Sequence, residues 1–117
     1  MKSEKEQEQD QKFLASGQEK LRLQIALERF FELEPEEAMY SIYREYLVRR
    51  FRPAMESLIR AQESLKAEKL FSCKEMTPGL LEELLGMASG CANTECYLWL
   101  LEQKRALYGF ERKDMEL

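Results

Sequence analysis

A series of start and stop signals for two consecutive helices occupies the last third of the chain, and it constrains the fold more than any other feature. Thr77 offers a capping hydroxyl, and Pro78 after it has no N–H to leave unpaired in a first helical turn. Gly90 follows the last apolar position of this helix, where a left-handed turn favours a residue without Cβ. Asn93 offers a cap to the next helix, and Gly109 supplies its end. The segment therefore predicts two helices folded back on each other.

The rest of the chain continues the helical pattern. Apolar side chains recur at helical spacing in three earlier segments, so the five helices are expected at about 19–31, 35–51, 53–69, 78–88 and 94–108. The chain has five Gly and three Pro, too few for the turns of many short strands. We therefore predict an all-α fold of about five helices, stacked as antiparallel helical hairpins in a compact bundle or a short helical-repeat array.

One domain and a tail are expected. The segment before the first long helix is rich in Glu, Gln and Lys, and it holds too little apolar surface to offset the entropy lost on ordering. Only Phe13 and Leu14 are candidates there for docking onto the body. Residues 1–18 are therefore predicted to be a flexible charged tail, and residues 19–117 a single α-helical domain.

Two helices carry apolar side chains on more than one face. Leu21 and Ile25 lie nearly opposite the apolar stripe of the first long helix, so that helix is either sandwiched between layers or in contact with another chain. The run 96–101 in the last helix is apolar all round, which is typical of a helix enclosed by neighbours. Trp99 within it either fills the core or forms a contact surface. We take Leu21, Ile25 and Trp99 as candidate partner-binding residues, and a homodimer is one form that such a contact takes.

The composition argues against catalysis and against a metal centre. The chain contains no histidine, which is the usual general base at neutral pH and the commonest transition-metal ligand. The acidic pairs Glu36-Glu37 and Glu82-Glu83 consist of helix neighbours that point in different directions, so neither pair converges on one proton or ion. The spacing of the three cysteines matches neither a zinc site nor a disulfide framework. We expect no enzymatic activity, no cofactor and no metal.

A basic segment with interleaved aromatic residues supports a second interpretation. Residues 44–60 hold five basic and two acidic side chains, although the whole chain has a net charge of −4. Arginine binds phosphates through two parallel hydrogen bonds, and aromatic rings stack on unpaired bases. The candidate nucleic-acid-binding residues are Arg44, Arg49, Arg50 and Arg52. Against this interpretation, most of the neighbouring aromatic residues fit the buried stripe of their helix, and nearby glutamates are suited to pair with the arginines.

The last two predicted helices resemble a known family. The residues that carry the resemblance are Thr77-Pro78, Ala88, Gly90, Asn93, Glu95 and Leu100-Leu101, and together they resemble an ankyrin-type helical hairpin over Thr77–Gly109. A second possible hairpin, with a weaker resemblance, lies about one repeat upstream and consists of Tyr40–Arg50 and Met55–Leu65. The resemblance implies a degenerate helical-repeat module that binds protein partners. It implies no catalytic residues.

The expected function follows from the missing chemistry and from the hairpin. No apolar run approaches the ~20 residues that span a bilayer, and the first residues lack the apolar core of a secretion signal. An odd number of cysteines without disulfide spacing favours a reduced, cytoplasmic setting. We predict a cytoplasmic, non-enzymatic helical protein–protein interaction module; the alternative is a nucleic-acid-binding accessory protein that uses the basic, aromatic segment 40–60.

Overall fold

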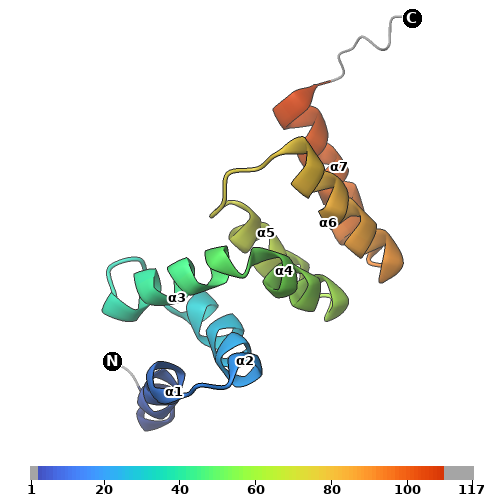
Figure 1. Cartoon of the computed structure of the whole chain (residues 1–117). Coiled ribbons are helices and arrows are strands. Elements are labelled where there is room, and N and C mark those ends of the chain that lie inside the picture. Colours follow the sequence, from blue (N-terminus) through green and yellow to red (C-terminus); the bar gives the residue numbers. More distant parts are fainter. Residues whose placement is uncertain (1–2, 110–117) are drawn as a thin grey trace, which may run out of the picture. The chain divides into compact units, whose positions relative to one another are not determined.

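Every regular element of the protein is helical within residues 3–109, the range that the computed structural model describes (Figure 1). Its seven α-helices are α1 (Glu4–Ala15), α2 (Glu19–Arg29), α3 (Ala38–Arg49), α4 (Phe51–Arg60), α5 (Ser64–Phe71), α6 (Pro78–Gly90) and α7 (Thr94–Tyr108), with a 3₁₀ turn at Phe30–Glu32 after α2. The all-α prediction is confirmed. The described range holds two helices more than expected, because residues 4–15 are helical and the segment 53–69 divides in two.

The chain divides into two compact units, Met1–Ala54 and Met55–Leu117, where the sequence predicts one domain from residue 19 onward. The boundary falls inside α4. In the N-terminal unit, α2 packs against both α1 and α3; in the C-terminal unit, α7 packs against both α6 and α5. Each unit therefore buries the apolar faces of its own helices against one another.

Helix α1 occupies most of the segment that the sequence predicts to be a flexible tail. Ser3 begins it with a reciprocal capping box, in which its hydroxyl accepts from the Glu6 backbone N–H and the Glu6 carboxylate accepts from the Ser3 N–H. Phe13 is buried, and its ring meets those of Tyr43 and Tyr46 edge-on, with centroids 4.6 and 4.9 Å away. One aromatic anchor therefore docks a helix whose composition is otherwise polar.

A buried ionic network ties α1 to the two helices that follow. Arg29 in α2 donates to both carboxylate oxygens of Asp10 in α1, over 2.9 and 3.2 Å, and also to Glu32 over 2.7 Å. The Tyr43 hydroxyl of α3 donates to the Asp10 carboxylate over 2.5 Å. The hydrogen bond to Asp10 raises the pKa of Arg29, while burial, and then the bond to Asp10, raise the pKa of Tyr43. The interior charges of Arg29 and Asp10 are thus paired, which is the condition for burying them.

A turn separates α4 from α5, where the sequence predicts one continuous helix. Gln62 adopts a left-handed backbone with φ 62°, and the N–H of Glu63 reaches back to the Leu58 carbonyl over 2.9 Å. These are the features of a Schellman-type helix end, which is usually made by glycine. In one continuous helix, Leu65 would lie on the same face as the buried Leu58; after the turn it is 77% exposed.

The caps predicted for the last two helices are confirmed. Thr77 begins α6 by accepting from the Leu80 N–H over 3.1 Å, and Asn93 begins α7 by accepting from the Cys96 N–H over 3.1 Å. The buried residues of α6 recur at helical spacing, and they are Leu80, Leu81, Leu84, Leu85 and Ala88. The capping signals and the helical spacing therefore located this pair of helices from local sequence.

One helix end is made by a different residue from the one predicted. Gly90 is the last residue of α6, and the left-handed position falls on Ala92 with φ 56°. The prediction placed the end too early because α6 continues beyond its last buried residue, Ala88. Gly109 takes φ 65° directly after α7, as predicted.

The same turn closes both helix pairs of the C-terminal unit. The N–H of Asn93 reaches the Ala88 carbonyl over 2.9 Å, as the N–H of Glu63 reaches the Leu58 carbonyl in the earlier turn. Each residue of the second turn lies 30 positions after its counterpart in the first. In this repeat, α4 and α5 correspond to α6 and α7. The sequence pattern instead places the upstream hairpin at residues 40–65.

One buried side chain bonds the two turns to each other. The side-chain amide of Asn93 donates to the Ile59 carbonyl at the end of α4 over 3.0 Å. Its oxygen accepts from the Cys96 N–H at the start of α7, and the Ser64 hydroxyl lies 3.5 Å from the same oxygen. The cap of α7 is therefore also a link between the two copies of the repeat.

Candidate functional site

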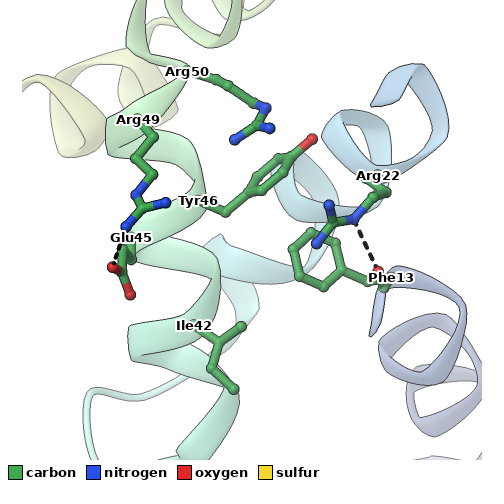
Figure 2. A pocket seen from close by; sticks show the side chains of 7 residues that line it. All are labelled: Phe13, Arg22, Ile42, Glu45, Tyr46, Arg49 and Arg50. Atoms are coloured by element: carbon green, nitrogen blue, oxygen red, sulfur yellow. Dashed lines mark hydrogen bonds and ion pairs between the residues drawn. The ribbon is translucent and has the colours of Figure 1, made fainter. Parts of the chain in front are cut away.

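Two surfaces of the protein hold the predicted binding residues or their neighbours, one in each unit. The first is a shallow pocket of about 250 Å³ in the N-terminal unit, shown in Figure 2. Its lining residues are Phe13, Arg22, Ile42, Glu45, Tyr46, Arg49 and Arg50. We call Arg22, Tyr46, Arg49 and Arg50 the arginine–tyrosine cluster. It combines three guanidinium groups with an aromatic ring. Whether it could bind a phosphate depends on whether these guanidinium charges are already paired with carboxylates.

Tyr46 lies at the centre of this cluster. The guanidinium carbons of Arg22 and Arg50 lie 4.9 and 4.2 Å from its ring centroid, and Arg22 also lies 4.6 Å from the Phe13 ring. Arg22 is fixed further by donating to the Phe13 carbonyl over 3.0 Å. The Tyr46 hydroxyl donates to the Glu19 carboxylate over 2.8 Å. Burial, with this bond added, raises the pKa of Tyr46 to about 12, so the hydroxyl stays protonated at neutral pH.

Each of the three arginines has a carboxylate partner, and Arg22 lies 3.8 Å from Glu19. Arg50 donates to both oxygens of Glu19, over 2.6 and 2.8 Å, and this pairing chiefly lowers the pKa of Glu19 and raises that of Arg50. Arg49 pairs with Glu45 one helical turn earlier over 3.1 Å. A phosphate that enters the pocket therefore has to displace a carboxylate from each of these arginines.

The structure brings only part of the predicted nucleic-acid-binding set together. Arg49 and Arg50 line the pocket, whereas Arg44 and Arg52 are exposed side chains outside its lining. Arg22, which the sequence analysis missed, completes the cluster from α2. No local sequence signal marks Arg22, because its partner ring in α3 lies far along the chain.

The predicted partner-binding residues are less accessible than expected. Ile25 is only 4% exposed and belongs to the interior of its unit, so its side chain offers almost no surface to a partner. Leu21 is half-buried. Trp99 is also half-buried, and its ring meets that of Phe71 edge-on with centroids 5.0 Å apart, so α5 already covers part of it.

The second surface is on α7, where the sequence predicts a helix enclosed on every side. Cys96 and Leu100 are buried, but Leu98 is 57% exposed and Leu101 is 39% exposed. At ~100° per residue, Leu98 points roughly opposite to both buried residues. We define the α7 outer face as Glu95, Leu98, Leu101 and Arg105, all of which are exposed. The prediction of enclosure was correct for one side of α7 and wrong for the other.

Helix α5 covers the inner side of α7. Phe71 of α5 contacts Trp99 as described above, and Glu68 of α5 lies close enough to Cys96 for its charge to act on the thiol. Burial raises the pKa of Cys96 to about 11, and the negative charges of Glu68 and Glu95 add to the shift. Phe71 of α5 therefore faces α7, and Glu68 lies on the preceding turn of α5.

The described part of the chain holds neither a cluster of metal-ligating side chains nor a membrane-spanning helix. Between residues 3 and 109, no three acidic or thiol side chains gather in a way that holds a metal ion. None of the helices described has both the length and the apolar character needed to cross a membrane. Comparison with family models, with curated proteins and with solved structures finds no match to this chain, so its function is argued from the fold and the two surfaces.

Proposed function

We propose that this all-α protein is a non-enzymatic helical-hairpin module that binds a protein partner through the α7 outer face. The observation that carries the proposal is the exposure of Leu98 and Leu101, three residues apart on the side of α7 that faces away from its own core. Covering a leucine side chain contributes ~1.5–3 kcal/mol relative to leaving it in water.

Other features agree with this proposal. Residues 77–109 resemble an ankyrin-type hairpin, and the resemblance points to the same class of function. The repeated turn makes the two helix pairs of the C-terminal unit equivalent, as in modules that bind through stacked hairpins. The three cysteines are free, which supports a reducing, cytoplasmic setting for the partner.

A binding experiment with matched variants tests the proposed surface. The wild-type chain and the double variant L98E/L101E are immobilised and exposed to nuclease-treated lysate of the source organism. We expect the double variant to lose a captured protein by tenfold or more, since two charges enter an apolar contact. The control is L65E, which changes a leucine on α5 that is 77% exposed, more than either α7 leucine, and this variant is expected to bind like the wild type. Equal capture by all three chains would overturn the proposed role of α7.

The second candidate function is nucleic-acid binding, and it rests on the convergence of three arginines beside Tyr46. We place it second because Arg49 and Arg50 already have carboxylate partners. Its test is retention on single- and double-stranded nucleic acid at low salt, with R49E/R50E as the variant. Retention that falls with salt and with the variant would support it, and no retention would end it.

A further inference from the structure

The 30-residue repeat shows which surface of α7 corresponds to a stacking surface elsewhere in the protein. In the first copy, the Phe71 ring of α5 meets the Trp99 ring of α7, and Glu68, three residues earlier, lies close enough for its charge to act on the Cys96 thiol. Thirty positions later in the second copy stand Leu98 and Leu101. The α7 outer face therefore occupies the position in the repeat through which α5 packs on the next helix pair. Phe71 is 6% exposed there, while Leu101 is 39% exposed.

The charges on the α7 outer face indicate what covers it. Glu95 lies on the N-terminal side of the leucine pair, and Arg105 lies on its C-terminal side. At 1.5 Å per residue, they are ~7 and ~8 Å from the midpoint between Leu98 and Leu101. A second α7 that runs antiparallel about this midpoint brings each Leu98 against the partner's Leu101 and each Glu95 beside the partner's Arg105. The face is thus complementary to itself.

We propose that the partner of the α7 outer face is a second copy of this chain, bound through an antiparallel, two-fold symmetric α7–α7 contact. This inference rests on the proposed function and names its partner. In the single chain Arg105 has a carboxylate, Glu102, at 3.8 Å on the preceding turn, which is a long ion pair at a solvent-exposed position. The second copy supplies Glu95 as an additional acceptor for that guanidinium.

The two-fold arrangement predicts how charge-reversal variants dimerise, alone and in a mixture. In E95R each chain sets an arginine against the partner's Arg105, and in R105E each chain sets a glutamate against the partner's Glu95. Both homodimers therefore contain two repulsive contacts. In a mixture of the two variants, the heterodimer pairs opposite charges at both contacts. A parallel two-fold contact also pairs opposite charges in the mixture, but its wild type already sets like charges against each other. Only the antiparallel contact therefore predicts that each single variant dimerises more weakly than the wild type and that the mixture restores dimerisation.

Sedimentation equilibrium and light scattering on the purified full chain provide the test. We expect the wild type to change from monomer to dimer as its concentration rises, and L98E to raise the dissociation constant tenfold or more. E95R and R105E are each expected to remain monomeric at concentrations where their equimolar mixture is dimeric. L65E is the matched control and is expected to dimerise like the wild type. Far-UV circular dichroism verifies that each exposed substitution keeps the helical content, and L98A replaces any variant that does not.

Two results would overturn the inference: a wild-type chain that stays monomeric at all accessible concentrations, or single charge variants that dimerise as tightly as the wild type. These failures differ from failure of the proposed function. If the wild type is monomeric but still captures a protein that L98E/L101E does not capture, the α7 outer face is a binding surface and its partner is a different protein. Equal capture by wild type and L98E/L101E removes the surface itself.

Discussion

Asn93 provides the sharpest test of the repeat, because one buried side chain has two separable roles. Its oxygen caps α7 through the Cys96 N–H, and its amide nitrogen donates to the Ile59 carbonyl in the turn of the other helix pair. Aspartate and asparagine are equally good helix caps. The substitution N93D therefore keeps the first role and removes the second, whereas N93A removes both.

N93D is expected to destabilise the fold more than N93A does. The loss of a helix cap alone would give the opposite order, because aspartate caps a helix and alanine does not. N93A loses a cap worth ~1 kcal/mol and a hydrogen bond worth ~1 kcal/mol net, so we expect a loss of about 2 kcal/mol. The Ile59 carbonyl keeps the Gln62 N–H at 3.1 Å, which limits the penalty. N93D places a buried carboxylate oxygen where a donor lay 3.0 Å from a carbonyl oxygen, and we expect a loss of about 3 kcal/mol or more.

Acidification supplies an internal check on N93D. The pKa of the introduced carboxyl is expected to rise in the folded state, because burial and the facing carbonyl disfavour its charge. A raised folded-state pKa means that the folded variant binds its proton more tightly than the unfolded one. The part of the deficit that comes from ionisation is therefore absent below the ordinary carboxyl pKa of ~3.9 and grows as the pH rises above it.

The assay is urea unfolding followed by the fluorescence of Trp99, the single tryptophan, which lies in the same unit as Asn93. The differences in the free energy of unfolding come from the midpoints and slopes. S64A is the control. The Ser64 hydroxyl lies 3.5 Å from the Asn93 oxygen, so we expect its removal to change the free energy of unfolding by less than ~0.5 kcal/mol. If N93D matches the wild type at neutral pH, the bond between the two turns contributes nothing and the reasoning fails.

A92G is expected to raise the free energy of unfolding by ~0.5–1 kcal/mol, because the left-handed backbone at Ala92 strains a residue with a Cβ; an unchanged urea midpoint would contradict this. E19Q is expected to flatten the acid unfolding curve. The hydrogen bond from Arg50 is the main cause of the lowered pKa of Glu19. Their pairing therefore stabilises the fold above the ordinary carboxyl pKa, and this stabilisation is lost as the pH falls through the lowered pKa. Circular dichroism between ~pH 6 and ~pH 2 measures the unfolding curves of both proteins. Cys96, with its pKa raised to about 11, is expected to react with Ellman's reagent only after unfolding, while the other two thiols react in the native protein; three fast thiols would show that α7 opens.

Local signals were sufficient where a helix end is made by the residue types that usually make it. Thr77 and Asn93 cap α6 and α7 as their sequence context predicts, since a cap needs only its own side chain and the next few backbone N–H groups. The end of α4 had no such signal. Gln62 takes a left-handed backbone without being glycine, and the bond from Asn93 to Ile59, 34 residues apart, helps to hold the turn. A long-range contact of this kind is invisible to periodicity.

The N-terminal unit shows the same limit for charged residues. The composition of residues 1–18 is typical of a tail, but Asp10 pairs with Arg29 19 positions later, and α1 is docked through that pair. Glu19 likewise neutralises Arg50 31 positions later, which turns an apparent basic cluster into a set of ion pairs. Charge counted along the sequence overestimates the free positive charge of a helix whenever acids from another helix fold onto it.

The apolar run in α7 had two explanations, and the structure divides it between them. Cys96 and Leu100 fill the core, while Leu98 and Leu101 repeat, 30 positions on, the surface through which α5 contacts α7. A helix that is apolar on both sides is what a stacked repeat requires, because each hairpin packs on one before it and one after it. Under the proposal made above, the exposed leucines are one half of a contact whose other half lies on a separate chain. The opposite charges flanking them explain why a second copy of this chain, in the antiparallel orientation, can supply that half.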